Sequence, residues 1–253
     1  MGLLISQLQE TKKELQQKTE DLKQSNKSLE EFAYIASHDL QEPLYIITAF
    51  LDKIRDKHKE GLKNEVLFLI DRIYNAALRM THLTQDLLNY ARINTRKKSF
   101  EKVDLNTLLK QILIDFELRI KETQAEITLG NLPILYADPL QMSQLFTNLL
   151  SNALKFKNEN KILEVRLDSK KTNEKNIEII IEDNGIGFER EYQEKIFQPF
   201  QRLHPKNEYE GSGMGLAICK KIVERHQGSI QAFSTPNEGT KFIIQLPTLQ
   251  EFI

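Results

Sequence analysis

Apolar residues recur every seven positions through the first 36 residues of the chain. A coiled coil needs apolar residues at two positions of each seven, and here polar side chains occupy most of the second positions, which weakens the contact between helices. Leucine stands at positions 8, 15, 22 and 29, and the partner positions hold Leu4, Thr11, Lys18, Ser25 and Phe32. The seven-residue repeat predicts a two-stranded coiled coil over residues 1–30. A weak seam suits a helix that transmits a signal, and a plain dimerisation spacer would show the same pattern.

Two longer apolar stripes follow, and their spacings of three and four residues are typical of helices. The first stripe holds Ala36, Leu40, Leu44, Ile47, Leu51 and Ile54, and the second holds Val66, Ile70, Ile73, Ala77, Met80, Thr84, Leu87 and Ala91. A polar stretch around Gly61 separates them. Residues 31–93 are therefore predicted to form an antiparallel helical hairpin. Two hairpins from two chains would bury both stripes in a dimeric four-helix bundle.

The pattern changes after residue 100. Residues 94–100 are polar and without periodicity, which is typical of a linker. A helix over residues 105–120 is expected to begin at Asp104, whose side chain can cap its first turn. Asp138 followed by proline predicts a second helix that runs to about Phe156.

Alternating apolar residues predict strands in the same part of the chain. The clearest alternations are Leu163, Val165 and Leu167, then Ile177, Ile179 and Ile181, and finally Phe242, Ile244 and Leu246. Residues 101–253 are therefore predicted to be an α+β domain in which helices cover one face of a mixed sheet.

Composition narrows the classes of function. The formal net charge of −1 gives no basic field that would favour nucleic acid. The lone Cys219 suits a reducing cytoplasm. No apolar stretch approaches the ~20 residues that span a bilayer, so no direct membrane span is expected. Because a coiled coil begins at residue 4 with no domain before it, an upstream sensor domain is expected to be missing from this chain.

His38 is the first candidate for chemistry. At 100° per residue it lies about 180° from the midpoint of Ala36 and Leu40, so its ring is expected to face solvent. A neutral imidazole can act as a nucleophile near pH 7, and Asp39 can orient the ring or accept a proton. An exposed histidine beside an aspartate is more often just surface, so the pair by itself leaves the function open.

Two amides form a second candidate site. Asn148 and Asn152 are four residues apart and share a helix face, and Lys155 lies three residues further on. Amide oxygens and a cation suit a site for Mg²⁺ and phosphate. A helix with a polar outer face would fit the bare pattern equally well.

Glycine turns form the remaining candidates. Asp183-Asn184-Gly185 follows a predicted strand, where a carboxylate could meet a ligand, although a tight hairpin turn has the same sequence. Alternate glycines at positions 211, 213 and 215 precede a helix, and their N–H groups could bind phosphate.

Taken together, these stretches resemble the motifs of sensor histidine kinases of two-component systems. The resembling segments are Phe32 to Leu44 (phosphoacceptor box), Gln144 to Phe156 (asparagine box), Asp183 to Phe188 (first glycine box), Ile196 to Arg202 (phenylalanine box), Gly211 to Ile218 (second glycine box) and Gly239-Thr240. They occur in the family's order, and the resemblance covers residues 30–247. It is closest to the variant in phytochrome-like and other soluble kinases.

The resemblance implies that ATP phosphorylates His38, which then passes the phosphoryl group to an aspartate in the receiver domain of a response regulator. It implies that Asn152 binds Mg²⁺, that Asp183 accepts a hydrogen bond from the adenine amino group, and that residues 200–210 form an ATP lid. The other implied nucleotide-binding positions are Asn148, Lys155, Phe156, Gly185, Gly187, Arg202, Gly211, Gly213, Gly215, Leu216 and Thr240. The implied fold of residues 101–253 is the α/β-sandwich ATPase domain shared with gyrase.

One position departs from the family pattern. Many relatives carry threonine or asparagine four residues after the phosphoacceptor histidine, and this chain has Glu42, which puts the usual phosphatase activity in doubt. Two alternatives to a kinase remain. An ATPase clamp is disfavoured by the box around His38 and by the lack of a transducer domain after the ATP site. A scaffold without activity is disfavoured by the retention of His38, Asn152, Asp183 and the three lid glycines.

Overall fold

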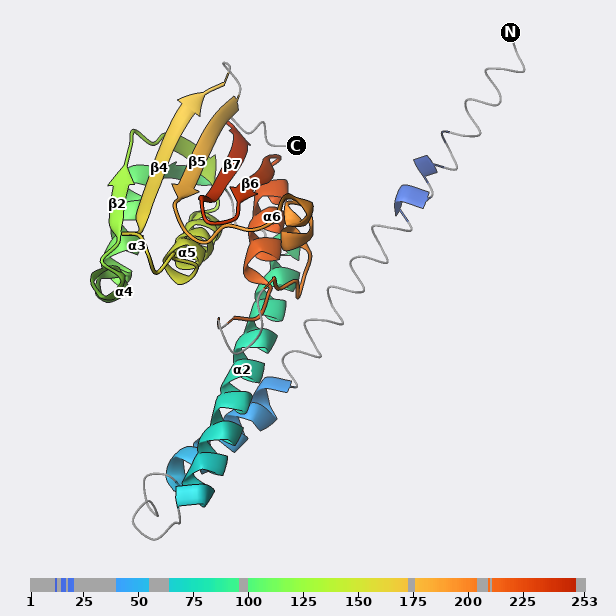
Figure 1. The fold of residues 1–253 in the computed structure, drawn as a ribbon. Coiled ribbons are helices and arrows are strands. Elements are labelled where there is room, and N and C mark those ends of the chain that lie inside the picture. Colours follow the sequence, from blue (N-terminus) through green and yellow to red (C-terminus); the bar gives the residue numbers. More distant parts are fainter. Residues whose placement is uncertain are drawn as a thin grey trace. The chain divides into compact units, whose positions relative to one another are not determined.

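The computed structural model of the chain describes residues 12, 15, 16, 18–20, 40–54, 64–95, 100–172, 176–203, 209 and 211–248 (Figure 1). The chain divides into two compact units, Met1–Arg92 and Ile93–Ile253. Most of the predicted coiled coil lies outside the described residues, although those described between residues 12 and 20 are helical. None of the described helices is long and apolar enough to cross a membrane.

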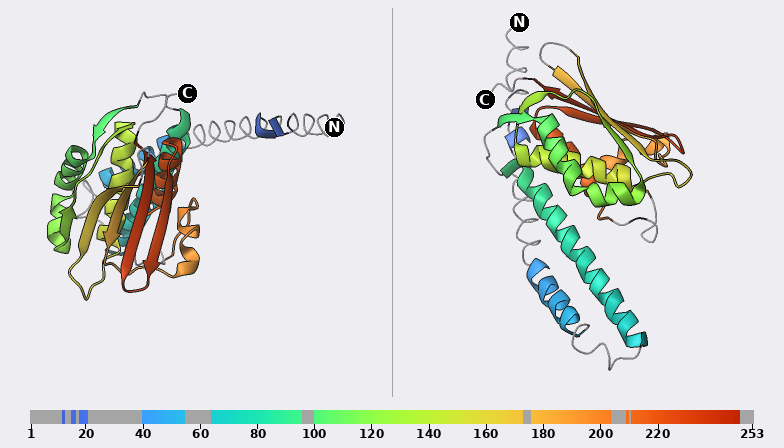
Figure 2. Two further views of the ribbon diagram at one scale, coloured as in Figure 1. Left: turned by 90° about the horizontal axis from the view of Figure 1, so that it is seen from above. Right: turned by 90° about the vertical axis from the view of Figure 1, so that its left-hand side faces the viewer.

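The first unit contains two helical segments that lie side by side (Figure 2). Residues 40–54 are helical, and helix α2 spans Asn64–Thr95. The Gln41 side-chain amide donates a hydrogen bond to the Gln85 amide oxygen at 2.9 Å, so the start of one segment meets the later part of the other. This antiparallel contact is the one expected of a hairpin. The predicted turn around Gly61 lies outside the described residues.

Each apolar stripe of this unit is only half buried. On α2 the buried members recur every seven residues, and they are Ile70, Ala77, Thr84 and Ala91. Three of the other four members are exposed, namely Val66 at 39%, Ile73 at 53% and Met80 at 49%, and Leu87 is half-buried. The first helical segment repeats the pattern, with Leu44 and Leu51 buried and Ile47 and Ile54 exposed. One side of each stripe is therefore buried within the chain, and the other side is exposed.

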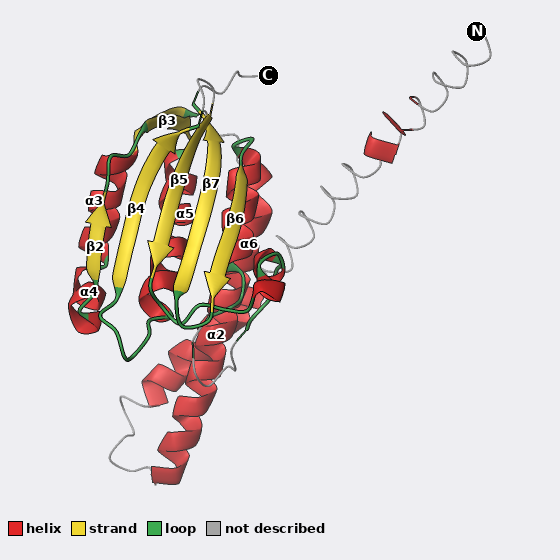
Figure 3. Cartoon of the chain, turned by 45° about the horizontal axis from the view of Figure 1, so that its top comes forward, coloured by secondary structure: helices red, strands yellow, loops and turns green. Residues whose placement is uncertain are grey.

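The second unit contains a five-stranded mixed sheet in the order β2-β4-β5-β7-β6 (Figure 3). The strands are β2 (Glu126–Leu129), β4 (Glu164–Lys171), β5 (Asn176–Asp183), β6 (Ser229–Thr235) and β7 (Gly239–Pro247). β2 and β4 are parallel, and every other neighbouring pair is antiparallel. A separate antiparallel ladder joins β1 (Glu101–Asp104) to β3 (Ile134–Ala137).

Helices cover one face of the five-stranded sheet (Figures 2 and 3). They are α3 (Leu105–Asp115), α4 (Glu117–Thr123), α5 (Pro139–Lys155) and α6 (Gly215–Arg225), and two short 3-10 turns, η2 (Arg190–Tyr192) and η3 (Lys195–Phe197), precede α6. Alternate strand residues such as Leu167, Ile181 and Ile244 are buried under these helices. The opposite face carries charged side chains, including the Lys241–Glu182 ion pair at 3.6 Å. The predicted α+β domain with one covered face is confirmed.

The local signals for helix starts are also confirmed. The Asp104 carboxylate accepts from the backbone N–H of Asn106 at 2.9 Å, and the Asp138 carboxylate caps α5 in the same way. The predicted helix over residues 105–120 is wrong in one respect, because it breaks at Phe116. The backbone of Phe116 leaves the helical region, with φ −94° and ψ 3°, which ends α3.

The half-buried stripes predict that the chain forms a homodimer through residues 1–93. Exposed apolar members spaced along a helix leave a surface larger than monomers usually tolerate. Sedimentation at micromolar concentration should show a dimer. Replacing Ile73 and Met80 by glutamate should shift it to monomer, whereas the same change at His82, an exposed polar residue of α2, should not. A monomeric wild-type chain would contradict the bundle.

Candidate functional site

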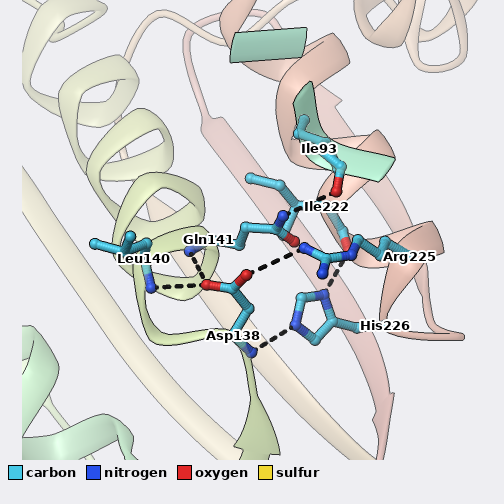
Figure 4. Close-up of polar contacts among 7 residues, drawn as sticks. All are labelled: Ile93, Asp138, Leu140, Gln141, Ile222, Arg225 and His226. Atoms are coloured by element: carbon cyan, nitrogen blue, oxygen red, sulfur yellow. Dashed lines mark hydrogen bonds and ion pairs between the residues drawn. The ribbon is translucent and has the colours of Figure 1, made fainter. Parts of the chain in front are cut away.

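A buried polar cluster fixes the N-terminal end of α5 (Figure 4). One oxygen of Asp138 caps α5, and the other pairs with the Arg225 guanidinium at 3.1 Å. The backbone N–H of Asp138 donates to Nε2 of His226 at 3.1 Å, while Nδ1 of His226 lies 2.7 Å from the Ile222 carbonyl oxygen. Nδ1 therefore carries the proton and the ring is neutral, in agreement with the lowered pKa that burial gives His226. The start of α5 is thus tied to the end of α6.

Two further contacts complete this cluster. The buried Gln141 amide donates to the Ile93 carbonyl in the last turn of α2 at 3.1 Å, and its own oxygen has no hydrogen-bond partner among the described residues. Phe100 stacks on His226 with ring centroids 4.6 Å apart. Because α5 and α6 are tied here, their other ends are held in a defined position, and those ends carry the predicted nucleotide motifs.

The asparagine box meets the second glycine box where α5 packs on α6. Nδ2 of Asn148 donates to the Gly215 carbonyl at 3.1 Å. Cys219 is buried between the two helices, where burial raises the pKa of its thiol to about 12, so it is an inert packing residue. Asn148 therefore positions the first turn of α6 as well as lying at a predicted ligand site.

Asn152 and Lys155 lie further along the same face of α5. The Asn152 side chain is partly exposed and makes no side-chain hydrogen bond within the described part of the chain. Nζ of Lys155 lies 4.3 Å from the centroid of the Phe156 ring. A Cβ atom built on Gly211 would lie 3.1 Å from the same Nζ. An amide oxygen and an ammonium group thus adjoin the glycine-rich turn.

The glycines at positions 211, 213 and 215 differ in whether the backbone conformation requires glycine. Gly211 and Gly213 have φ values of +137° and +79°, which side chains rarely adopt. Gly215 has ordinary backbone, and a Cβ there would meet nothing nearer than Asn148 at 3.8 Å. The protein itself therefore does not require glycine at 215. The N-terminus of α6 suits a phosphate group that approaches the helix N–H groups.

Asp183 lies at the end of β5, directly beside the end of α5. Its Oδ1 accepts from the N–H groups of Gly185 at 2.9 Å and Thr240 at 3.3 Å. Its Oδ2 has no hydrogen-bond partner among the described residues. Burial raises the pKa of this carboxyl to about 6. Such a carboxylate is desolvated by its surroundings and incompletely satisfied, which suits an acceptor for a ligand N–H group.

Glycine at 185 allows the turn after Asp183 to reach α5. The N–H of Ile186 donates to the Phe156 carbonyl at 2.9 Å, and a Cβ on Gly185 would collide with that same oxygen. A Cβ on Gly187 would collide with the Thr235 carbonyl of the β6–β7 hairpin. The first glycine box is therefore held between α5 on one side and the hairpin on the other.

Sequence reasoning missed the role of Asn184. Its side-chain amide donates to the Ile162 carbonyl at 2.9 Å, and its oxygen accepts from the Glu164 N–H at 2.9 Å. This two-way contact fixes the β5 turn to the start of β4. The Asp-Asn-Gly sequence carries the signal, because asparagine in a turn is suited to bonding backbone groups.

Arg202 contacts the backbone of the predicted lid. Its guanidinium donates to the Gly211 carbonyl and, at 2.6 Å, to the Tyr209 carbonyl. Arg202 thus links the two ends of the segment predicted to be the lid, whose residues 204–208 and 210 lie outside the described part of the chain. Leu216 is partly exposed on the first turn of α6.

His38 and Asp39 lie outside the described residues. Glu42 is exposed in the helical segment 40–54. The remaining motifs meet at one end of the helix-covered sheet, where α5, the β5 turn, the β6–β7 hairpin and the N-terminus of α6 converge.

This arrangement fits a purine nucleotide with a metal ion. Asp183 and Thr240 would hold the base, and Lys155 with the turn at residues 211–215 would hold phosphates. The described residues contain no group of three or more histidine, cysteine, aspartate or glutamate side chains that could hold a metal ion. An ion that takes one amide oxygen from Asn152 and its other ligands from phosphate and water, as Mg²⁺ does, fits this donor set.

Two protein families match the chain in separate segments. Residues 28–96 match the His Kinase A (phospho-acceptor) domain. Residues 137–250 match the histidine kinase-, DNA gyrase B- and HSP90-like ATPase.

Curated relatives extend the similarity across most of the chain. Phytochrome-like protein Cph1 of Synechocystis sp. is 38% identical over 234 residues, which cover 92% of this chain and 31% of that protein. Adaptive-response sensory kinase SasA of Synechococcus elongatus is 31% identical over 253 residues, which cover 92% of this chain and 63% of that protein. The chain thus spans about a third of the length of the phytochrome-like relatives.

Solved structures agree on the fold. Full-length ShkA in complex with AMPPNP has a TM-score of 0.69 at 22% identity, and the match covers 87% of this chain and 46% of that one. The catalytic domain of histidine kinase ThkA has a TM-score of 0.52 at 27% identity, and the match covers 60% of this chain and 97% of that one.

The raised pKa of Asp183 predicts that ATP affinity falls as pH drops below about 6, by about tenfold per pH unit. Because Oδ1 already accepts two N–H groups, the proton occupies Oδ2, which can then no longer accept from adenine. Asp183→Asn should abolish this dependence and weaken binding about ten- to hundredfold at pH 8. Binding of a fluorescent ATP analogue, measured across this pH range, reports both effects. Protonation of the nucleotide itself affects the wild-type protein and the variant equally.

Stability without nucleotide should respond in the opposite direction. The folded-state pKa lies above the ordinary 3.8, so the free energy of unfolding loses the contribution of Asp183 as pH rises from about 4 to 6. Asp183→Asn should therefore raise the free energy of unfolding at pH 7.5 by roughly 1–3 kcal/mol. Asp168→Asn is the control, because the pKa of Asp168 is lowered, chiefly by its hydrogen bond from the Ser169 N–H. An ATP affinity that is flat from pH 5 to 7.5 would contradict the role of Asp183.

Proposed function

The chain belongs to the sensor histidine kinases of two-component signal transduction, and on this premise we propose that it uses ATP to phosphorylate His38 and then transfers the phosphoryl group to an aspartate of a response regulator. The observation that carries the proposal is the convergence of Asn148, Lys155, Asp183 and the glycine turn at residues 211–215 at one end of the sheet. These motifs are far apart in sequence, and each contributes a different part of a nucleotide site.

In the proposed reaction an imidazole nitrogen of His38 attacks the γ-phosphorus of ATP. The bond from that phosphorus to the bridging oxygen breaks and ADP leaves, while Asp39 orients the ring or takes its proton. Little covalent chemistry is required of the protein, so catalysis consists mainly of positioning and charge neutralisation. Lys155 and the N–H groups of the glycine turn supply part of that neutralisation. Mg²⁺, held by Asn152, supplies the rest when bound.

The proposed organisation follows the matched segments. Residues 31–93 form the dimerisation and phosphotransfer hairpin, residues 94–100 the linker, and residues 101–253 the catalytic domain, with a coiled coil over residues 1–30. A homodimer is the acting species, the partner is a receiver domain, and the proposed location is the cytoplasm. The similarity to phytochrome-like kinases supports this organisation.

The deciding experiment is incubation of the purified chain with radiolabelled ATP and Mg²⁺. Label on the protein that is stable to base and released by acid indicates phosphohistidine. ATP turnover without label would favour an ATPase clamp, and neither label nor turnover would favour a scaffold.

His38→Ala should abolish incorporation of label and leave ATP affinity unchanged, because His38 lies outside the segment that contains the nucleotide motifs. His82→Ala removes an exposed histidine from α2 and is the matched control, which should label normally. Labelled phosphate in the His38→Ala protein would refute the assignment.

Asn152→Ala should remove the Mg²⁺-dependent part of nucleotide binding and lower autophosphorylation by at least about a hundredfold, since the amide is the proposed protein ligand of the metal. Binding measured in the presence of a chelator should change little. The control is Asn160→Ala, an exposed asparagine after the end of α5. Equal loss of binding with and without Mg²⁺ would show that Asn152 is structural.

Glu42→Thr should speed dephosphorylation of the partner by about fivefold and leave the kinase reaction unchanged. A carboxylate near an anionic phosphoryl group costs roughly 1 kcal/mol at 4 Å in water, and a hydroxyl can hold the attacking water without that repulsion. The assay is phosphate release from a receiver domain that this kinase has phosphorylated. Slower release with the variant would show that the acid assists.

A further inference from the structure

Ser234, a residue that sequence reasoning did not select, lies in one row with the proposed base-binding residues. In the sheet register Asp183 on β5 pairs with Thr240 on β7, and Thr240 pairs with Ser234 on β6. Directly paired residues of neighbouring strands point to the same face. The next row on that face, Ile181-Phe242-Ala232, is buried under the helices. Ser234, Thr240 and Asp183 therefore form a polar row at the end of the helix-covered face.

The Ser234 hydroxyl has three neighbours, and they determine where its proton lies. It lies 2.7 Å from the Gly239 carbonyl oxygen, 2.9 Å from the Phe188 backbone nitrogen and 3.1 Å from the Thr240 hydroxyl oxygen. A carbonyl can only accept, so Ser234 donates its single proton to Gly239. The Phe188 N–H can only donate, so Ser234 accepts from it. The bond between the two hydroxyls must then be donated by Thr240.

This assignment determines what Thr240 can offer a ligand. Its one hydroxyl proton is committed to Ser234, so its oxygen presents only lone pairs elsewhere. Its backbone N–H is committed to Oδ1 of Asp183 at 3.3 Å. Thr240 and Oδ2 of Asp183 thus form a pair of neighbouring acceptors.

Two acceptors discriminate between the purines by their substituent at carbon 6. Adenine carries an amino group there, which donates two hydrogens. Guanine carries a carbonyl oxygen, which can only accept and would face two acceptors without a proton between them. A buried acceptor without a donor costs more than a hydrogen bond gains.

We propose that Ser234 is a positioning residue for base selection, which holds the Thr240 hydroxyl as an acceptor and thereby restricts the site to 6-amino purine nucleotides. This inference rests on the proposed function, since it concerns the base of the nucleotide that the kinase uses. Without Ser234, the Thr240 hydroxyl is free to turn its proton towards a 6-oxo group, and Asp183 alone discriminates.

The test compares the affinities of the 253-residue chain for ATP and GTP. Each unlabelled nucleotide displaces a fluorescent ATP analogue in the presence of Mg²⁺, so the readout is independent of phosphorylation. Ser234→Ala should lower the ratio of ATP affinity to GTP affinity by about three- to tenfold, which corresponds to the free energy of one hydrogen bond. Ser234→Thr retains the hydroxyl and should keep the wild-type ratio. Ser229→Ala, at the other end of β6, is the matched control.

A double-mutant cycle tests whether Ser234 acts through Thr240. In a Thr240→Val background, Ser234→Ala should no longer change the ratio, because the hydroxyl that it orients is absent. Ser234→Cys, which keeps the volume and bonds weakly, replaces Ser234→Ala if that variant does not fold.

Three results would overturn the inference. Equal loss of ATP and GTP affinity in Ser234→Ala would mean that Ser234 only braces the turn through Phe188. An unchanged ratio would mean that it orients nothing. If Ser234→Ala changed the ratio just as much in the Thr240→Val background, Ser234 would not act through the Thr240 hydroxyl. Failure of the wild-type chain to bind ATP would instead refute the proposed function, and the inference with it.

Discussion

The proposed nucleotide site depends on one backbone contact, between the Phe156 carbonyl at the end of α5 and the Ile186 N–H after β5. This hydrogen bond of 2.9 Å brings the asparagine box to the first glycine box. It forms only because residue 185 has no side chain, since a Cβ would occupy the position of the carbonyl. Asp183, two residues earlier, is thereby placed beside α5 and loses water. Its pKa is raised chiefly because burial removes the carboxyl group from water.

The burial of Asp183 lowers the stability of the protein when no nucleotide is bound. Asp183 is ionised at neutral pH although its surroundings disfavour the charge, so part of the fold's stability is given up for an available acceptor. Other contacts keep the geometry. Asn184 ties the turn to β4, and the pair of Asp138 with Arg225 ties α5 to α6 at the far end.

The two units differ in how completely they bury their apolar surface. In the second unit helices and sheet bury each other within one chain. In the first unit Ile70, Ala77 and Thr84 are covered, but Ile73 and Met80, on the same stripe, are exposed. A hairpin of two helices has too little surface to enclose both sides of its stripes. The exposed side of each stripe supports the proposed homodimer, which would bring two copies of the phosphoacceptor segment into one assembly.

The periodicity of apolar residues by itself predicted the hairpin helices and the three long strands. The aspartates at positions 104 and 138 predicted the helix caps, because a cap depends on groups only two or three residues away. Motif spacing likewise located the candidate site residues. Only the tertiary structure decided the break at Phe116, the short strands β1, β2, β3 and β6, and the tasks of Asn184, Arg202 and Ser234. Each of these depends on a partner distant in sequence or on backbone groups that no side-chain pattern records. Ser234 shows the reason most clearly: its hydroxyl acquires a direction only when β7 supplies a carbonyl and a second hydroxyl and the loop after β5 supplies an N–H group.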